Sequence, residues 1–459
     1  MLLGKMVESF VERAPLAVMT RIAVEHLVSP NLVNDLFERH AHRQYTRELT
    51  LATLTRLMSL VTLDSLPSLR AAYQEDEESV GTSIAAVYDK VNGVEPAVCQ
   101  ALVAETAQRC AEMIGELKAV PASLLPGYNV RILDGNHFSG TEHRLSELRT
   151  MRAGALPSQA LVVLDPRRQL ATHVIPCEDA HAQERSLLDS VLPLVGLKDL
   201  WIADRNFCTT RFLFGIADRR GSFLIRQHRS TLTWKLLKSP VKRGRTASGQ
   251  VFEQPVELTE AATGRTLKVH RVTLKLDNPT RDGETEIHLL TNLPASAAPA
   301  ARVADLYAKR WSVERLFLEL TETLTCEVRT LGYPRAAIFA FCLALLAWNL
   351  ISVVKAALRS VHGAQTIDDN LSGYYVSLEI SRTTPGMMIA IPPEEWRAYQ
   401  TMPTAQVAKT LCEIAKSVRL SKYQKHPRGP KKPKPKKQSG AKIKHVSTAR
   451  LLAARSGYN

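Results

Sequence analysis

The chain has 459 residues, of which 45% are hydrophobic, and a formal net charge of +15. This length and apolar content predict a soluble globular protein with two or three buried cores, and they argue against a largely disordered chain. Fourteen Lys and Arg but no Asp or Glu fall between Lys416 and Asn459, so the rest of the chain is close to neutral.

The N-terminal stretch MLLGKMVESFVERAP carries acidic residues where a signal peptide would be apolar, so we do not expect secretion. Residues 336–354 are long enough to span a membrane, but this stretch stands alone and contains Asn349, so we expect a buried helix that covers a sheet. The odd number of cysteines, with no CxxC pair, predicts reduced core residues in a cytosolic protein. These are Cys99, Cys110, Cys177, Cys208, Cys326, Cys342 and Cys412.

Residues 1–118 have helical periodicity and predict an all-helical N-terminal domain with a DNA-binding or accessory role. Within it, TSIAAVYDKVNGVEPAVCQALVAET can form two helices about a turn at Asn92 and Gly93. Such a pair resembles a helix-turn-helix DNA reader, although similar pairs are common in ordinary helical bundles.

From residue 128 the pattern changes to short β-rich runs, which predict an α/β catalytic domain over residues 128–355. Three strands, a helix, a strand, a helix and a strand predict a mixed sheet flanked by helices. Residues 230–294 alternate apolar and polar side chains without a helix, which predicts an antiparallel β insertion. Residues 356–418 are expected to be helical or irregular.

Residues 419–459 are rich in Lys, Pro and Gly, which predicts a disordered basic tail. Such a tail would bind DNA phosphates without reading sequence. A terminus that only improves solubility is the alternative.

Two aspartates lie at polar positions in apolar strands: Asp134 in VRILDGNHF and Asp204 at the end of LWIAD. A buried carboxylate is costly unless it is paired or binds a metal. The first and fourth strands can be neighbours in a sheet of this order, which would bring the two carboxylates together. Each aspartate could instead belong to an ordinary turn, with Asp204 paired to Arg205.

The stretch YAKRWSVERLFLELTE places Tyr307, Arg310 and Glu314 at offsets of three and four, which predicts one face of one helix. If that face looks at the two aspartates, Glu314 completes a cluster of three carboxylates. Oxygen ligands of this kind suit Mg²⁺ or Mn²⁺. Arg310 and Tyr307 would then reach phosphate oxygens, while Trp311 is expected to be a core residue.

These motifs resemble the DDE transposases of bacterial insertion sequences, and more narrowly the branch with a Tyr-Arg-Glu-Lys signature and a β insertion. The resemblance covers residues 130–349 and implies a ribonuclease-H-like core. It also implies two Mg²⁺ ions, with Mn²⁺ as a substitute, and cut-and-paste transposition by DNA cleavage and strand transfer. By position, Asp134, Asp204 and Glu314 match the metal-binding triad, and Tyr307 and Arg310 match the DNA-contacting pair.

Arg205 and Arg315 are further predicted DNA-binding residues beside this cluster. The resemblance also implies double-stranded DNA as partner, a homodimer on that DNA, and a place in the bacterial cytoplasm with the nucleoid. We expect no membrane partner.

One position departs from the family pattern, because Thr321 stands where the signature has a lysine. Either a nearby cation such as Arg315 or Arg329 substitutes, or the phosphate contact is weaker. Two alternatives therefore stay open. The chain could be a metal-dependent nuclease without strand transfer, or a domesticated DNA-binding protein that has lost catalysis.

Overall fold

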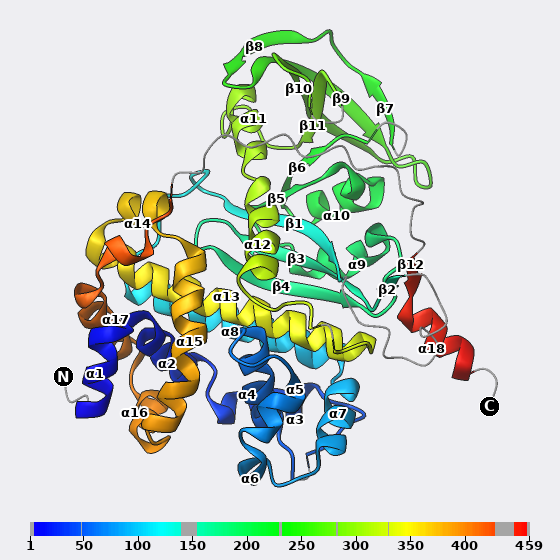
Figure 1. The fold of residues 1–459 in the computed structure, drawn as a ribbon. Helices are drawn as coiled ribbons and strands as arrows, with labels where there is room; N and C mark the ends of the chain where they lie inside the picture. The colour runs from blue at the N-terminus through cyan, green and yellow to red at the C-terminus, as the bar shows by residue number, and fades with distance from the viewer. Residues whose placement is uncertain are drawn as a thin grey trace.

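The computed structural model describes most of the chain, arranged as a sheet half and a helical half (Figure 1). The sheet half consists of the large sheet with α9 to α12, and the helical half of α1 to α8 and α13 to α17. The described residues are 4–46, 48–138, 154–228, 232–280, 283–328, 330–426 and 445–456.

The large sheet has ten strands in the order β4-β3-β1-β5-β6-β11-β10-β9-β7, with β8 paired to β9. β1 and β5 run parallel, as do β5 and β6, whereas the other pairs are antiparallel, so the predicted mixed α/β sheet is confirmed. The predicted neighbours, the first and fourth long strands, are β1 and β5. The strands are β1 (Asn129–His137), β3 (Gln159–Asp165), β4 (Leu170–Cys177), β5 (Asp199–Ala203), β6 (Ser222–Arg226), β7 (Thr233–Leu236), β8 (Val241–Thr246), β9 (Gly249–Thr259), β10 (Thr266–Leu276) and β11 (Glu286–Thr291).

The predicted antiparallel β insertion is present, and it extends the sheet because β11 pairs with β6. Four of its strands were predicted, but β8 was not. The side chains of β8, VKRGRT, are exposed or half-buried on both faces, so they show no apolar alternation. Only its backbone pairing with β9 makes it a strand.

Helices cover both faces of the sheet. Successive side chains of a strand point to opposite faces, so neighbouring residues enter different cores. Ile132 packs into the core that contains α13, and Leu133 into the core that contains α10. Accordingly α8 (Pro96–Glu116) and α13 (Pro334–His362) lie against β4 on one face (Figure 1). The other face carries α9 (Leu188–Val191) and α10 (Thr210–Asp218).

The helix predicted from AQERSLLDSVLPLV is broken into η2 (Glu184–Leu187), α9 and η3 (Leu192–Leu194). Pro193 lies within η3, where its missing N–H cannot continue an α-helix.

The long apolar helix α13 is the centre of the helical half. By length and composition it could cross a membrane, but its apolar window is 100% buried, so the predicted buried helix is confirmed. It runs unbroken past residue 355, where we predicted a domain boundary. The helices around it are α1 (Lys5–Arg13), α2 (Pro15–Leu27), α3 (Pro30–His40), α4 (Leu51–Thr62), α5 (Leu69–Gln74), α6 (Glu77–Val80), α7 (Ile84–Gly93), α14 (Ala364–Asn370), α15 (Gly373–Ala390), α16 (Glu394–Thr401) and α17 (Thr404–Ser417).

Helices from both ends of the chain share this half, since α2 packs against α15, α16 and α17. The pair α7 and α8 is the possible helix-turn-helix. Nine of the 21 residues of α8 are buried, and the helix packs against α13 and β4. DNA reading by this pair stays a prediction. All seven cysteines are free, and five of them are buried, as predicted.

The predicted disorder of residues 419–459 is wrong for two segments. The first is η5 (Leu420–Tyr423), where Tyr423 is buried and its hydroxyl donates to Glu379. The second comprises β12 (His445–Ser447), which pairs with β2 (Gly154–Leu156), and α18 (Thr448–Ser456). Both segments contact distant parts of the chain, and composition alone does not reveal such contacts. Residues 427–444 lie outside the described residues.

Candidate active site

The two predicted aspartates lie side by side at the sheet edge. Leu133 of β1 is in register with Ala203 of β5, and because these strands are parallel, the next residue on each is an aspartate at the same end. The backbone N–H of Gly135 donates to Asp134 Oδ1 at 3.0 Å. The sheet therefore brings Asp134 and Asp204 together from positions seventy residues apart.

The third predicted carboxylate reaches this edge on α12 (Trp311–Glu322), which follows α11 (Ala300–Ala308). We predicted one helix through this stretch, but the N–H groups of Lys309 and Arg310 bond to carbonyls three residues back, at 3.0 Å each. This tight turn separates α11 from α12. It keeps Tyr307, Arg310 and Glu314 on the same side.

Arg310 joins the two elements. Its Nη1 donates to Asp134 Oδ2 at 3.1 Å, and its Nη2 donates to Glu314 Oε1 at 2.6 Å. The Arg310 side chain is only 11% exposed, so these charge-assisted bonds lie in a poorly hydrated environment that strengthens them. The Arg310 guanidinium thus lies between the carboxylate of Asp134 on the sheet and the carboxylate of Glu314 on α12.

Burial, with smaller contributions from the carboxylates of Asp204 and Glu184, raises the pKa of Asp134 to about 7 against the opposing effects of Arg310 and the Gly135 N–H. Burial lowers the pKa of Arg310, but Tyr307 and the carboxylates of Asp134, Asp204 and Glu314 outweigh it, so the pKa lies above its ordinary value. A single arginine therefore does not fully neutralise the group, and an additional cation would be stabilised there.

No group of three or more His, Cys, Asp or Glu among the described residues is arranged to hold a metal ion in this structure. The donor chemistry nevertheless fits a hard divalent cation, because the available ligands are carboxylate oxygens. The raised pKa of Asp134 fits as well, because burial disfavours its ionised form and a bound cation would stabilise that form. Whether Asp134, Asp204 and Glu314 bind metal stays a prediction.

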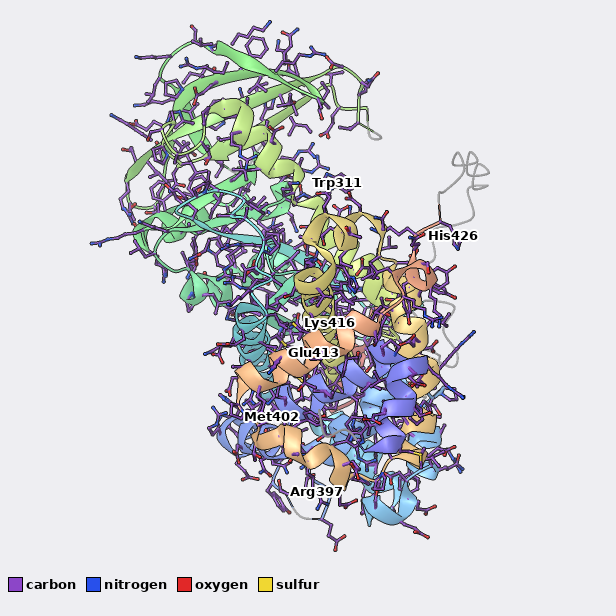
Figure 2. The ribbon with its side chains drawn as sticks, turned by 90° about the vertical axis from the view of Figure 1, so that its left-hand side faces the viewer. Trp311, Arg397, Met402, Glu413, Lys416 and His426 are labelled. Carbon is purple, nitrogen blue, oxygen red and sulfur yellow. The ribbon has the colours of Figure 1, made fainter. Side chains whose placement is uncertain are left out.

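The two aromatic residues of this stretch do not both behave as predicted. Tyr307 is 9% exposed, and burial raises the pKa of its hydroxyl, so its predicted DNA contact requires movement. Trp311, expected in the core, is 63% exposed. It lies where the sheet half meets the helical half (Figure 2), with the Arg310 guanidinium 5.4 Å from its ring centre.

The two further predicted DNA-binding arginines differ in their contacts. Arg205 Nη1 donates to Glu284 Oε1 at 3.2 Å, and the same carboxylate pairs with Arg226. Arg315 is exposed on α12 next to Glu314. Arg329, the other possible substitute for the missing lysine, lies outside the described residues.

Sequence reasoning missed Glu184 of η2, a fourth carboxylate beside the cluster. A Cβ added to Gly135 would lie 2.0 Å from Glu184 Oε1, so the glycine leaves room for this side chain next to Asp134. The Nδ2 of Asn206 donates to Glu184 at 2.5 Å. The only hint in the sequence was Gly135 itself, directly after the strand aspartate.

One comparison with known proteins bears on this part of the molecule. Residues 125–350 match the family model described as "Transposase DDE domain". No curated protein matches the chain. Among solved structures it is similar to "Cryo-EM structure of piggyBac transposase synaptic complex with hairpin DNA", at 10% identity and a TM-score of 0.39, over 87% of this chain and 85% of that chain.

A structural likeness at that score does not establish a shared fold. The family match is independent of it, and it covers Asp134, Asp204, Arg310 and Glu314. The family match supports the predicted resemblance to DDE-type transposases over residues 125–350.

Proposed function

We propose that the chain is a transposase that cleaves DNA at transposon ends and joins the freed ends to target DNA, with divalent metal ions. One observation carries the proposal. Asp134 lies in β1 and Asp204 follows the parallel neighbouring strand β5, one position after the register pair Leu133 and Ala203, and Arg310 links Asp134 to Glu314 of α12. We further propose a ribonuclease-H-like core, which the strand order β4-β3-β1-β5-β6 supports.

Asp134, Asp204 and Glu314 are the residues that would hold the metal, with Mg²⁺ as the expected ion and Mn²⁺ as a substitute. A bound pair of such ions would supply Lewis-acid chemistry, which activates the attacking oxygen and stabilises the leaving oxygen in phosphoryl transfer.

Arg310 has a separate role in this proposal. In the free protein it balances Asp134 and Glu314. Its Nε is buried without a hydrogen-bond partner among the described residues, so the guanidinium retains a donor for a phosphate oxygen. Arginine suits this contact because it stays charged at all relevant pH values and its N–H groups form a fork. Tyr307 lies beside it and interacts with it.

We also place the chain in the bacterial insertion-sequence branch with the Tyr-Arg-Glu-Lys signature, which Tyr307, Arg310 and Glu314 support and Thr321 weakens. The protein would act on the nucleoid in the bacterial cytoplasm. Because two DNA ends have to be joined, we expect it to work as a homodimer on double-stranded DNA.

The test is a cleavage and joining assay with labelled duplexes from the two ends of the DNA segment that encodes the chain. In Mg²⁺, the wild type should give cut ends and products joined to a target plasmid. Asp204→Ala should abolish both and retain DNA binding. Asp189→Ala is the matched control, because Asp189 is an exposed aspartate of the same half, paired with Arg211.

Each result has a definite reading. Cut ends without joined products would favour a nuclease. Binding without cleavage in the wild type would favour a domesticated DNA-binding protein. Unchanged cleavage by Asp204→Ala would remove the proposed metal site.

A further inference from the structure

A second concave site lies on another side of α12, where it meets α13 and α14. Its volume is about 370 Å³. Trp311 and His426, chain neighbours of two of its lining residues, mark this side of the molecule in Figure 2. We call it the α12–α14 pocket, and its charged lining residues are Arg315, Glu319, Lys355, Arg359, Asp368 and Lys425.

Four of these six charged residues are cations, so the lining carries an excess of two positive charges. Arg359 is fixed at the base of the pocket, with a side chain only 3% exposed. Its Nε donates to Asp368 at 2.8 Å and its Nη2 to Gln169 at 3.0 Å. This arginine and Asp368 balance each other, so the excess charge lies elsewhere.

The second carboxylate, Glu319, is shared between two donors. It accepts a hydrogen bond from the indole N–H of Trp348 at 3.1 Å and a long one from Lys355 at 3.5 Å. The Lys355 side chain is 11% exposed, and Glu319 is its one hydrogen-bond partner within the described part of the chain. An ammonium group can donate three bonds, so Lys355 is under-satisfied for a group with so little access to water.

Arg315 and Lys425 form the exposed part of the lining. The Lys425 ammonium donates to the backbone carbonyls of Asp368 and Asp369 at 2.8 and 3.1 Å, which are neutral acceptors. Burial lowers the pKa of Lys425, and the charges of Arg315 and Lys355 lower it further. Arg315 makes no hydrogen bond or ion pair with the residues that the structure describes. Arg315, Lys355 and Lys425 therefore lie close enough to repel one another, and the carboxylates of Asp369 and Glu319 offset this repulsion at Lys425 only in part.

The backbone adds to this potential. Gly373, the first residue of the 18-residue helix α15, lines the pocket, and Ser372 makes no side-chain cap there. The N-terminus of a helix carries partial positive charge and free N–H groups. It therefore favours an anion in the same space as the three cations.

Building on the proposed function, we propose that the α12–α14 pocket binds a phosphodiester group of the DNA on which the active site acts. Arg315 follows Glu314 directly on α12, so DNA bound at the carboxylates lies within reach of the pocket. A phosphodiester carries one negative charge and accepts several hydrogen bonds, which matches the unbalanced cations at the mouth.

The experiment measures DNA affinity of the full-length protein as a function of salt. The test variant replaces the two mouth cations, Arg315→Gln with Lys425→Gln. Its matched control is Arg397→Gln with Lys409→Gln, which removes two exposed cations from α16 and α17. Both variants keep Lys355 and Arg359, so neither leaves a buried charge unpaired. Loss of one phosphate contact should reduce the slope of log affinity against log salt by about 1.

A second readout uses lysine acetylation with and without duplex DNA or inorganic phosphate. We expect DNA to protect Lys425 and to leave Lys409 reactive. Equal salt slopes for the test and control variants would overturn the proposal while the proposed function stands. Protection by inorganic phosphate but not by DNA would also overturn it, in favour of a small-anion site. A wild type that binds no DNA would remove both proposals.

Discussion

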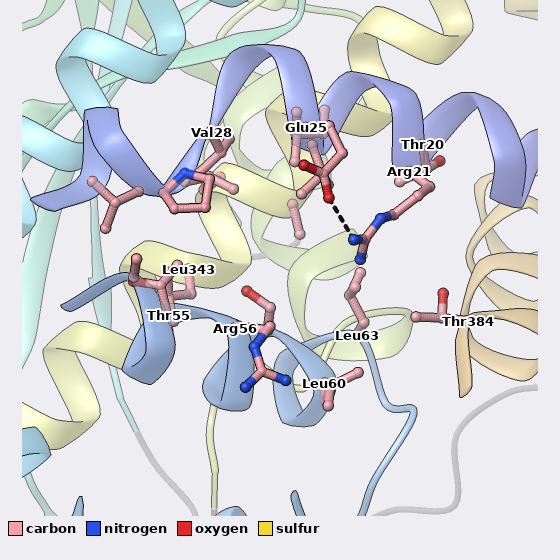
Figure 3. Close-up of a pocket in the computed structure, with 18 of the residues that line it drawn as sticks. Thr20, Arg21, Glu25, Val28, Thr55, Arg56, Leu60, Leu63, Leu343 and Thr384 are labelled. Carbon is pink, nitrogen blue, oxygen red and sulfur yellow. Dashed lines mark ion pairs between the residues drawn. The ribbon is translucent and has the colours of Figure 1, made fainter. Parts of the chain in front are cut away.

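The carboxylate cluster at the sheet edge and a cavity in the helical half both depart from a well-packed protein interior, the first by crowding charges and the second by leaving space unfilled. At the sheet edge, Asp134, Asp204, Glu184 and Glu314 gather around Arg310, and burial with neighbouring charge raises the pKa of Asp134. In the helical half, a cavity of about 270 Å³ lies between α2, α4, α13 and α15. Figure 3 shows its lining, mostly apolar apart from residues such as Arg56 and the paired Arg21 and Glu25.

The two departures have different physical consequences. Crowded carboxylates cost electrostatic free energy that a bound cation would recover, so the sheet edge is organised for binding. A mostly apolar cavity forfeits dispersion contacts, and nothing in its lining suggests phosphoryl transfer. The comparison teaches that activity and stability should respond to mutations in different halves.

The largest expected effect is on activity. Glu314→Gln should reduce DNA cleavage by about 100-fold or more, because it removes a charged oxygen ligand. The free energy of unfolding should change by less than about 1 kcal/mol, since the amide oxygen can still accept from Arg310.

Cleavage in Mg²⁺ and urea unfolding measure the two quantities. Glu322→Gln, an exposed glutamate on the same helix, is the control and should cleave like wild type. Wild-type cleavage by Glu314→Gln would show that the sheet edge is not organised as we describe.

The helical half should show the reverse response. Leu345 on α13 is 0% exposed, and Leu345→Ala should lower the free energy of unfolding by about 2–5 kcal/mol. Cleavage per folded molecule at low temperature should stay within a few-fold of wild type. Leu197→Ala, at an exposed leucine, should cost less than about 0.5 kcal/mol. A large loss of cleavage in folded Leu345→Ala would mean that the two halves are coupled.

The part of the active site that could be predicted is the part that strand order and helix spacing determine. Asp134 and Asp204 were found because each is a polar residue at the end of an apolar run, and parallel pairing then makes them neighbours. Arg310 and Glu314 followed from their spacing of four, although the turn at Lys309 divides the predicted helix.

The residues that sequence reasoning misplaced depend on what packs against them. Spacing gives the helix face of Trp311 but does not say whether another element covers that face, and within the described ranges the side chain stays 63% exposed. Glu184 lies in a short 3₁₀ segment without periodicity, so only tertiary structure brings it over Gly135. The pairing of β12 with β2 joins residues nearly three hundred positions apart, which composition could not predict.

A smaller effect concerns the pH dependence of stability, which should report the cost of ionising Asp134 without any measurement of cleavage. The pKa of Asp134 is raised to about 7 in the folded chain, against an unfolded value near 3.9. Between these values the folded state binds more protons, so this group's contribution to stability is present at low pH and is lost as pH rises through about 7.

In urea unfolding with a chelator, Asp134→Asn should therefore gain stability relative to wild type between pH 5 and pH 8, by a few kcal/mol at most. Asp189→Asn, on an exposed aspartate, is the control and should keep the wild-type pH dependence. A constant difference between Asp134→Asn and wild type across this range would mean that Asp134 is already ionised at pH 5.

The smallest expected effect concerns Thr321, which stands at the position of the signature lysine. Its hydroxyl donates to the carbonyl of Phe317 at 2.9 Å and is otherwise near solvent, so a lysine fits without burying charge. Thr321→Lys should raise DNA affinity and cleavage a few-fold by adding a phosphate contact, whereas Thr321→Gln, similar in size but uncharged, should not. If the two variants behave alike, the phosphate contact is already made by another cation. In that case the double variant Arg315→Gln with Lys425→Gln should bind DNA more weakly than wild type, because it removes cations that can make this contact in place of a lysine at position 321.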